Sequence, residues 1–509
     1  MNNRGTRGAL LQLAWISSLA LLSACNGGLA TDAGASTNDG ENRSLAKPGL
    51  CTPDCNGKAC GDDGCGGSCG SCAGAELCNG LGTCYDPNQC TPDCAGKECG
   101  DDGCGGGCGS CTAPATCGGA GVRNRCGDGT ATTGLFLDGF FPIGSFIIYP
   151  PQTAMHVARG INTAVGIPDT SGEYTDRQWD DAMVAAGLKV IRRPIGNLVT
   201  DAAKPHLLAW AHPDEPDYCD HCSAPWIDYP LMQSIEADYA TWKAAAPDMP
   251  VYINFGGSDI LDGSPYSCNG PGDQSGPETD LDCYPRLIAA ADWIVNDIYP
   301  IDGWLSDEAW RHDITDVGQV LDKLRGKPFK IDPTWSTKWT DKPLMGFVEA
   351  SFFDDSTGGT RAATRHEVRA MIWDLIIHGA RGIFYFPLVV NPGFMWDDMP
   401  AGVEAEVTLQ DGIITQLAPV LQDVINPTTL SATMSSAQLE AGWRDTPSGK
   451  YFFVLNTRKA PVTGATIRLS GTGSATSAAA FGESRNEPIT GGAITDDFGA
   501  YGLHIYLVN

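Results

Sequence analysis

Residues 207–217 read LLAWAHPDEPD and residues 344–351 read LMGFVEAS, so in both stretches an apolar run leads directly into carboxylates. Short apolar runs of this kind are typical of buried β-strands. The polar residues that follow them then lie at the carboxyl ends of those strands. The two stretches are therefore interpreted as strands that deliver Glu215 and Glu349 to one edge of a sheet.

The same pattern extends along the chain from about residue 135 to residue 426. Amphipathic segments of helical periodicity separate the apolar runs, and the first and fifth connections show this periodicity most weakly. Eight strands alternating with helices predict a (β/α)8 TIM barrel, because a doubly wound sheet would carry a glycine-rich phosphate loop after its first strand. The predicted strands are Pro142–Tyr149, Ile161–Ile167, Leu188–Ile195, Leu207–Ala211, Val251–Phe255, Trp293–Ile298, Leu344–Val348 and Gly382–Phe386. The predicted helices are Thr175–Ala186, Leu231–Ala246, Asp316–Arg325, Thr364–His378 and Val407–Val424.

Residues 427–509 lack helical periodicity and contain alternating apolar and polar runs between Gly, Asn, Thr and Pro. Three such runs are Tyr451–Leu455, Ala465–Leu469 and Gly502–Val508. Alternation with a period of two predicts strands, so this region is expected to form a small β-sandwich.

The amino terminus has the features of an export signal. Arg4 and Arg7 precede an apolar run that ends in Leu-Ser-Ala-Cys25. This ending resembles the bacterial lipobox, which implies cleavage after residue 24, acylation of Cys25 and, with Asn26 following, an outer-membrane or surface location. An ordinary cleaved signal is the alternative. Residues 25–50 contain hardly any large apolar side chain and are predicted to be a flexible tether.

Two cysteine-rich repeats follow, over residues 51–89 and 90–128, with seven cysteines recurring 39 residues later in CTPDCNGKACGDDGCGGSCGSC and CTPDCAGKECGDDGCGGGCGSC. Cys84 and Cys126 complete eight cysteines in each repeat. The repeats have almost no apolar core, and an exported chain pairs its thiols, so disulfides are favoured over a zinc ribbon. The modules resemble those of secreted myxobacterial proteins. A compact spacer and a glycan-binding module both fit the repeats.

Composition limits the partners. The chain has 21 cysteines, and setting Cys25 aside leaves an even number, as export predicts. The formal charge of −28 disfavours nucleic acid and anionic membrane surfaces, so contact with a membrane is expected through the lipid alone. No cofactor is predicted. The oligomeric state is left open.

Two carboxyl groups from facing strands provide the chemistry of glycosidic cleavage, in which one protonates the leaving oxygen and the other attacks or stabilises the sugar carbon. The layout resembles the large clan of retaining glycoside hydrolases with the acid/base on strand four and the nucleophile on strand seven. The resemblance implies Glu215 as acid/base and Glu349 as nucleophile, with Tyr299 as a hydrogen-bond donor to the nucleophile. It also implies a glycan substrate and, for a retaining enzyme, carboxyl groups about 5–5.5 Å apart, against roughly 6.5–9.5 Å for inversion.

One residue departs from that clan. Asp214 precedes Glu215 where the clan usually has Asn, and a second carboxylate there would raise the pKa of Glu215. An Asp-Glu pair also resembles hexosaminidase families in which the substrate assists: the aspartate orients a 2-acetamido group and the glutamate is the acid. A third hypothesis is a non-catalytic, glycan-binding surface protein whose barrel is a relic of an enzyme.

Further candidates are less specific. Aromatic side chains near strand ends can stack on sugars, although most aromatic residues belong to cores. The tryptophan candidates are Trp210, Trp304, Trp310, Trp335 and Trp396, and the polar candidates for substrate contacts are Arg192, Arg193, His212 and Asp307. Cys219, Cys222, Cys268 and Cys283 are expected to form two disulfides at the substrate rim rather than a metal site. Asp273, Asp280 and Asp282 are weak candidates for calcium.

Together these features predict a surface-anchored retaining glycoside hydrolase that acts on an extracellular polysaccharide or oligosaccharide. Cys25, the tether and the repeats would form a stalk that holds the barrel away from the membrane. The sequence leaves open the sugar, the linkage and the choice between endo and exo action.

Overall fold

The computed structural model describes most of the chain from residue 139 onward. The described ranges are 139–217, 230–256, 260–261, 280–301, 313–330, 332–352, 361–390 and 393–509, with short segments between residues 55 and 127. The chain divides into two compact units, Met1–Thr91 and Pro92–Asn509. Cys25 and the predicted tether lie outside the described residues.

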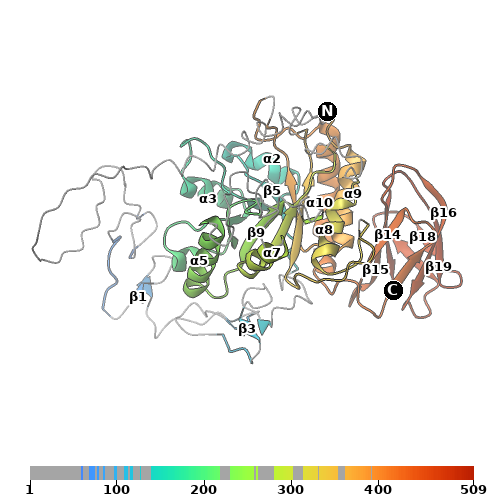
Figure 1. Ribbon diagram of the computed structural model, residues 1–509, viewed down its shortest axis with the longest axis horizontal. Helices are drawn as coiled ribbons and strands as arrows, with labels where there is room; N and C mark the ends of the chain where they lie inside the picture. The colour runs from blue at the N-terminus through green and yellow to red at the C-terminus, as the bar shows by residue number, and fades with distance from the viewer. Residues whose placement is uncertain are drawn as a thin grey trace, which may run out of the picture. The chain divides into compact units, whose positions relative to one another are not determined.

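Eight parallel strands close into a barrel in the order β10-β11-β12-β5-β6-β7-β8-β9. Two of them, β5 and β9, are labelled near the centre of Figure 1. All eight predicted strands are confirmed, each within a few residues of its predicted bounds, because apolar runs of this length bury both faces of a parallel strand. The strands are β5 (Ile143–Phe146), β6 (Thr163–Val165), β7 (Lys189–Arg192), β8 (Leu207–Ala211), β9 (Val251–Gly256), β10 (Trp293–Asp297), β11 (Leu344–Glu349) and β12 (Ile383–Phe386).

Helices follow the barrel strands on the outside of the barrel (Figure 1). The five predicted helices are α3 (Asp176–Ala185), α5 (Pro230–Ala245), α8 (Asp316–Leu324), α9 (Arg365–Ile377) and α10 (Ala401–Leu421). Capping boxes at Thr175 and Thr364 fix the starts of α3 and α9. The helices α2 (Thr153–Ala158), α4 (Leu198–Ala202) and α7 (Asp280–Ala289) were not predicted; α2 and α4 are too short for a clear period, and α7 contains Pro285. No helix among the described residues is both long and apolar enough to cross a membrane.

The barrel lumen is filled by side chains from alternate positions of the strands. Because side chains alternate along a strand, residues that follow a lumen residue by two positions point the same way. Three polar residues stand two positions after a lumen residue and therefore point toward the lumen. They are Asn254 after Tyr252, Asp297 after Val295 and Glu349 after Phe347. The buried lumen residues are Val165, Ile191, Ala209, Ala211, Tyr252, Trp293, Val295, Met345, Phe347 and Phe384.

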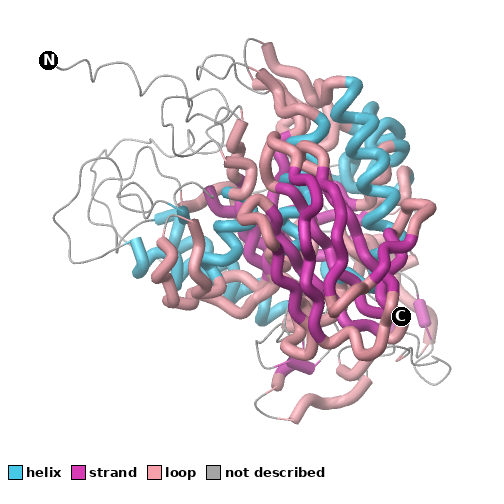
Figure 2. Tube along the Cα trace, turned by 90° about the vertical axis from the view of Figure 1, so that its right-hand side faces the viewer, coloured by secondary structure: helices cyan, strands magenta, loops and turns pink. Residues whose placement is uncertain are grey.

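The carboxyl-terminal region is a β-sandwich, as predicted. Its sheets have the orders β13-β16-β19 and β14-β15-β20-β17-β18, and their paired strands are antiparallel. In Figure 2 strands are drawn in magenta, and the carboxyl-terminal side of the molecule faces the viewer. One apolar cluster contains Ile467 and Leu469 from the first sheet and Phe452 and Val454 from the second. The strands are β13 (Ser431–Met434), β14 (Leu439–Thr446), β15 (Gly449–Asn456), β16 (Val462–Ser470), β17 (Ser477–Ala480), β18 (Asn486–Pro488), β19 (Ala493–Phe498) and β20 (Leu503–Val508).

The sandwich packs against α9 through β14 and β15. The rings of Trp373 on α9 and Phe453 on β15 stack with centroids 5.6 Å apart. The buried guanidinium of Arg444 donates to the carbonyl of Ile376 at 3.3 Å. This junction therefore combines apolar packing with buried polar groups.

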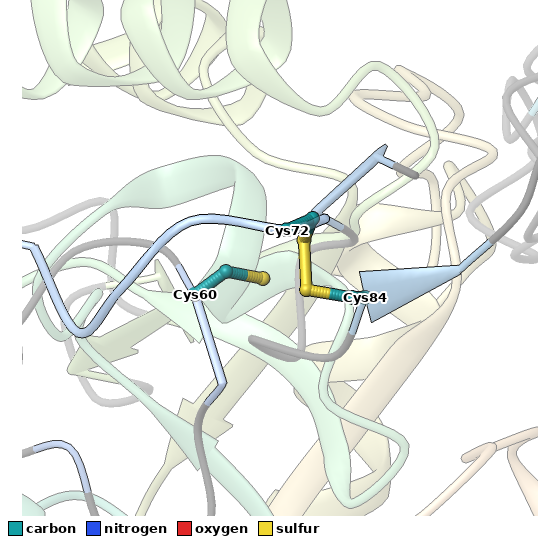
Figure 3. A group of neighbouring side chains, drawn as sticks. All are labelled: Cys60, Cys72 and Cys84. Atoms are coloured by element: carbon teal, nitrogen blue, oxygen red, sulfur yellow. A yellow bond between two sulfur atoms is a disulfide. The ribbon is translucent and has the colours of Figure 1, made fainter. Parts of the chain in front are cut away.

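The cysteine-rich repeats are cross-linked by disulfides, as predicted. In the first repeat Cys55 pairs with Cys69 and Cys72 with Cys84, and Figure 3 shows the second bond with Cys60 beside it. Cys60 is also in a disulfide, so its sulfur is not a free thiolate. The second repeat has the pairs Cys94–Cys108, Cys99–Cys117 and Cys111–Cys126. Short paired strands lie beside these bonds, β1 (Leu77–Cys78) with β2 (Cys84–Tyr85) and β3 (Thr116–Cys117) with β4 (Cys126–Gly127).

Candidate active site

Glu215 lies four residues after β8, in a loop at the carboxyl-terminal mouth of the barrel. Its backbone has φ 42°, a left-handed conformation that a non-glycine residue adopts rarely. The buried carboxylate of Asp217 ties this loop to β9 and α7. It accepts hydrogen bonds from the Gly256 amide at 3.2 Å and from the Tyr284 hydroxyl at 2.8 Å. These two hydrogen bonds hold the turn in its strained conformation. Strained backbone of this kind is common at functional sites.

Three carboxyl groups meet at this mouth, and we call Asp214, Glu215 and Asp297 the mouth cluster. Asn254 joins two of them, since its Nδ2 donates to Asp214 Oδ1 at 2.9 Å and to Asp297 Oδ2 at 3.1 Å. The carboxyl groups of Glu215 and Asp297 are in hydrogen-bonding contact, which requires a proton on one of them. Among the described residues, no basic side chain forms an ion pair with these three groups.

Several polar atoms beside the mouth cluster are buried without a hydrogen-bond donor or acceptor. They are Asp297 Oδ1, Asn254 Oδ1 and the hydroxyl of Tyr252, which lies in the lumen below. Most buried polar groups in proteins are hydrogen-bonded, so orphan atoms gathered in one place indicate a site prepared for a ligand or for proton transfer.

The environment of the mouth cluster favours protonated carboxyl groups. Burial raises the pKa of Glu215 well above its usual range, and the negative charges of Asp297 and Asp214 add to the shift. Burial and the charge of Asp214 raise the pKa of Asp297 to about 7, although hydrogen bonds from Glu215, Asn254 and Tyr299 oppose the increase. A carboxylic acid held protonated near neutrality is a competent proton donor.

Asp214 differs from its two neighbours at the level of the whole residue, which is exposed, whereas Glu215 is half-buried and Asp297 is 8 % exposed. Its carboxyl group is nevertheless enclosed by protein, and this burial raises the pKa of Asp214, while the bond from Asn254 acts in the opposite direction. Asp214 therefore shares the tendency of its two neighbours to keep a proton.

Glu349 is the last residue of β11 and has no exposed area. Its Oε2 accepts from the backbone amide of Ile301 at 2.8 Å. Alternation along β11 directs it to the same side as Phe347, which is toward the lumen. Glu349 therefore belongs to the carboxyl-terminal end of the barrel. The five main influences on the pKa of Glu215 come from burial and from Asp297, Asp214 and Asp217, and Glu349 is not among them.

Tyr299 lies two residues after β10, and its hydroxyl donates to Asp297 Oδ2 at 3.4 Å. Its ring packs on Phe386 of β12 at 5.0 Å between centroids. The expected donation to Glu349 stays a prediction. The contact with Asp297 brings Tyr299 to the mouth cluster.

The expected substrate contact of Trp210 is wrong because its side chain is buried, whereas that of Arg193 stays a prediction. Trp210 is 0 % exposed, and its indole donates a hydrogen bond to Asp201 Oδ2 at 2.8 Å. Its neighbours Ala209 and Ala211 face the lumen, so the side chain of Trp210 points to the helix side of the barrel wall. Arg193 is exposed but makes a two-point ion pair with Asp176, at 2.8 and 2.6 Å, at the start of α3.

Two secondary candidates are also occupied elsewhere. Arg192 is buried in the barrel wall, where it pairs with Asp180 and Asp201. His212 is buried, stacks on Trp242 at 4.8 Å and hydrogen-bonds the carbonyl of Ala290 at 2.9 Å. Both are structural residues of the barrel wall.

An aromatic platform lies on loops after the first and last barrel strands. Tyr149 and Trp396 stack with centroids 5.2 Å apart and planes 6° from parallel, and Phe394, which is 52 % exposed, meets Trp396 edge-on. The Tyr149 hydroxyl donates to Glu173 at 2.9 Å, which fixes the ring. A flat, half-exposed aromatic pair at the mouth can stack on a sugar ring. Trp335, by contrast, donates to the carbonyl of Lys323 at 2.9 Å and packs against Trp339.

Several predicted residues cannot be placed. Trp304, Trp310, Asp307, Asp273, Cys219, Cys222 and Cys268 lie outside the described residues, and of Cys283, Asp280 and Asp282 the backbone alone is described. The rim disulfides and the weak calcium candidates stay predictions.

Sequence reasoning assigned no role to Asn254 or Asp297. Both interrupt apolar strands, VYINFG and WIVND, at positions in register with lumen residues. A polar residue on the lumen side of a buried strand is the signal that would have identified them, because its burial is costly without a partner.

No protein-family model matches the chain, and no curated protein matches it. Solved structures do. A family 51 alpha-L-arabinofuranosidase from Bifidobacterium longum is 12% identical, with 75% of this chain and 98% of that chain covered and a TM-score of 0.41. A GH30 endoxylanase from Clostridium papyrosolvens is 13% identical over 75% and 98% of the two chains, with a TM-score of 0.36. An alpha-amylase from H. orenii is 11% identical over 73% and 98%, with a TM-score of 0.38. The assignment of the barrel rests on its own strand order.

Proposed function

We propose that this chain is a retaining glycoside hydrolase in which Glu215 is the general acid and base. The mouth cluster carries the proposal, because burial and the neighbouring carboxyl groups raise the pKa of Glu215 at the carboxyl-terminal mouth of the barrel. The Glu215 proton passes to the glycosidic oxygen as the bond from that oxygen to the sugar carbon breaks. The resulting Glu215 carboxylate then takes a proton from the attacking water.

The group that stabilises the sugar carbon has two candidates. In the double displacement implied by resemblance, Glu349 attacks and forms a glycosyl-enzyme. In the substrate-assisted route, the 2-acetamido oxygen of the substrate attacks, and Asp214 orients the amide. Both routes retain the anomeric configuration and share the acid Glu215.

Accessibility favours Asp214. Residue Asp214 is exposed at the mouth and Asn254 orients its carboxyl group, whereas Glu349 has no exposed area and is bound to the amide of Ile301. A nucleophile must reach the sugar carbon to within about 3–3.5 Å. We therefore favour the substrate-assisted route and a glycan that contains 2-acetamido sugars.

The deciding experiment compares the wild type with Glu215→Gln, Asp214→Asn and Glu349→Gln on aryl glycosides with and without a 2-acetamido group and on a polysaccharide panel. Product anomers are identified by NMR. Glu236→Gln is the control, since Glu236 pairs with Arg286 on α5 and α7, in side chains more than a third exposed.

Each result assigns one mechanism. Activity confined to 2-acetamido substrates, abolished in Asp214→Asn and nearly intact in Glu349→Gln, supports the substrate-assisted route. The reverse pattern supports double displacement. Binding of a glycan without turnover, unchanged in Glu215→Gln, would overturn the enzymatic proposal and leave a glycan-binding surface protein.

Presentation at the cell surface is part of the proposal and rests on the lipobox-like Leu-Ser-Ala-Cys25. An enzyme on a lipidated stalk acts on a polymer too large to import. Metabolic labelling with a fatty acid should mark the wild type and leave Cys25→Ser unlabelled, with the variant released into the medium.

A further inference from the structure

A second cluster of ionisable groups lies far along the chain from the mouth cluster, where α8, α9 and the sandwich meet. We call His378, Asp374, Glu440 and Asp322 the junction cluster. His378 follows α9, Asp374 lies in α9, Asp322 in α8 and Glu440 in β14. The cluster therefore joins two helices of the barrel to one strand of the sandwich.

The histidine is held from both sides. Its Nδ1 lies 2.8 Å from Asp322 Oδ2, and its Nε2 lies 2.9 Å from Glu440 Oε2 and 3.7 Å from Asp374 Oδ1. Histidine ligands of metals in proteins commonly donate their other ring N–H to a carboxylate, which fixes the tautomer and the ring orientation. Asp322 occupies that position here and leaves Nε2 directed at two carboxylates.

Asp374 faces a second carboxyl group inside this cluster. Its side chain is fully buried, its Oδ2 accepts from the amide of Gly318 at 2.9 Å, and its carboxyl group is in hydrogen-bonding contact with that of Glu440, while Oδ1 receives no N–H donor. A Cβ at position 318 would lie 2.4 Å from Asp374 Oδ2 and 2.5 Å from His378 Cδ2, so a glycine is required for this close approach. Two buried carboxyl groups in contact are costly unless a proton or a metal ion lies between them.

The charges of the cluster call for a cation. Three carboxyl groups surround one imidazole; among the described residues, the ammonium of Lys327 lies 3.1 Å from Asp322, and the charge of Arg458 also acts on Glu440. A positive charge between His378 Nε2 and the two carboxyl groups would balance them, and a metal ion can supply it.

The geometry fits a small divalent ion. His378 Nε2, Asp374 Oδ1 and Glu440 Oε2 lie within 4.8 Å of one another. In tetrahedral zinc sites, bonds of about 2.0–2.2 Å place ligand atoms roughly 3.3–3.6 Å apart. A zinc ion here would therefore replace the hydrogen bond of 2.9 Å between His378 Nε2 and Glu440 Oε2 and move these two atoms apart by roughly half an ångström. One nitrogen and two carboxylate oxygens suit Zn²⁺ and leave a fourth position for water, whereas Ca²⁺ requires six to eight oxygens.

We propose that His378, Asp374 and Glu440 bind a Zn²⁺ ion that cross-links the sandwich to the barrel. Asp322 orients the imidazole and is not itself a ligand. Because Glu440 comes from β14 and the other two ligands from the end of α9, the ion ties the two domains at one point.

The test uses the full, oxidised chain after treatment with a chelator and dialysis. Zn²⁺ is titrated by calorimetry, bound zinc is counted by mass spectrometry, and Tm is followed with and without Zn²⁺. Co²⁺ is used as a spectroscopic probe, because thiolate ligands from the cysteine-rich repeats would produce charge-transfer absorption that nitrogen and oxygen ligands lack.

The expected result is one Zn²⁺ per chain, a Tm that rises with Zn²⁺ concentration, and Co²⁺ spectra without thiolate absorption. Asp374→Asn and Glu440→Gln should abolish the binding, and Asp322→Asn should weaken it by about 10–100-fold. Glu483→Gln is the matched control, since Glu483 contacts His504 at 2.6 Å within the sandwich and Arg485 supplies the positive charge there.

The proposal stays testable if one variant folds poorly. Asp374→Asn keeps the shape of the side chain and removes a buried carboxyl group, so its Tm in chelator should equal or exceed that of the wild type. A chain that binds no zinc, or that binds it equally well in Asp374→Asn, Glu440→Gln and the control, would overturn the proposal. Glycosidase activity is not needed for any of these measurements.

Discussion

The mouth cluster contrasts with a second group of charged residues, which lies on the helix side of the barrel wall around β7, α3 and α4. This second group, the wall cluster, consists of Arg192, Asp180, Asp201 and Lys204. Arg192 pairs with Asp180 at 2.6 Å and with Asp201 at 2.7 Å, and Lys204 pairs with Asp180 at 2.9 Å. In the mouth cluster three carboxyl groups face one another without an ion pair to a described cation.

The two clusters shift their carboxyl pKa values in opposite directions. In the wall cluster, burial alone would raise the pKa of both aspartates. Hydrogen bonds from His206 and Arg192 instead lower the pKa of Asp180 below its ordinary value, and hydrogen bonds from Arg192 do the same for Asp201. In the mouth cluster burial and like charges raise the pKa of Glu215 and Asp297 together. Buried acids that pair with cations keep their charge, whereas buried acids without a cation favour the protonated form.

The prediction with the largest expected effect tests whether the mouth cluster is catalytic. Glu215→Gln removes the proton donor and should lower kcat by about 10²–10⁴-fold on a glycoside with a poor leaving group. The measurement is a steady-state assay, with Tm recorded in parallel. An unchanged kcat would remove the catalytic interpretation of the mouth cluster.

The second prediction concerns stability in the wall cluster. Asp201→Ala leaves the buried guanidinium of Arg192 and the indole of Trp210 without their partner, and should cost about 3–5 kcal/mol of unfolding free energy. Urea unfolding measures the loss. Activity below the new Tm should stay close to that of the wild type, and a large loss of kcat in the folded variant would contradict the division between the clusters.

The third prediction uses pH. The pKa of Asp297 is raised from 3.8 in the unfolded chain to about 7 in the folded protein, so the folded state binds more protons and loses stability as pH rises through that window. Asp297→Asn removes this loss. It should stabilise the protein by about 1–3 kcal/mol at a pH near 8 and by much less at a pH near 4. Thermal unfolding of both chains across this range tests the sign.

The smallest effect concerns two tryptophans. Trp396→Ala should weaken substrate binding by about 0.5–1.5 kcal/mol, a rise in KM of about 2–10-fold, because it removes half of the stacked pair with Tyr149. Trp210→Phe should leave KM unchanged and lower Tm, since the indole of Trp210 is buried against Asp201. Equal effects on KM would remove the platform from the binding site.

Most of the fold was predictable from sequence because burial on both faces of a strand requires unbroken apolar runs, and all eight runs became strands. The short helices α2 and α4 were missed because one or two turns display no period. Trp210 was wrongly expected to contact substrate for a different reason. Adjacent residues of a strand point alternately into the lumen and into the wall, and which of the two Trp210 faces depends on how β8 pairs with β7.

The candidate site was predictable in part. Position at a strand end was enough to select Asp214 and Glu215, which the structure joins in the mouth cluster. Asp297 and Asn254 were not assigned roles, because their meeting with Glu215 depends on closure of the barrel, which brings β8, β9 and β10 side by side. Whether a carboxylate is accessible, the property that separates Asp214 from Glu349, also depends on tertiary packing.

The disulfides of the repeats determine how they transmit a mechanical load. In the second repeat Cys94 is bonded to Cys108 and Cys111 to Cys126, so a covalent path from Cys94 to Cys126 crosses the chain only between residues 108 and 111. In the first repeat Cys55–Cys69 and Cys72–Cys84 leave residues 69 to 72 as the corresponding bridge. Tension along the chain therefore bypasses the loops within each repeat. Each repeat behaves as a nearly inextensible link, which lengthens under drag only when a sulfur–sulfur bond breaks.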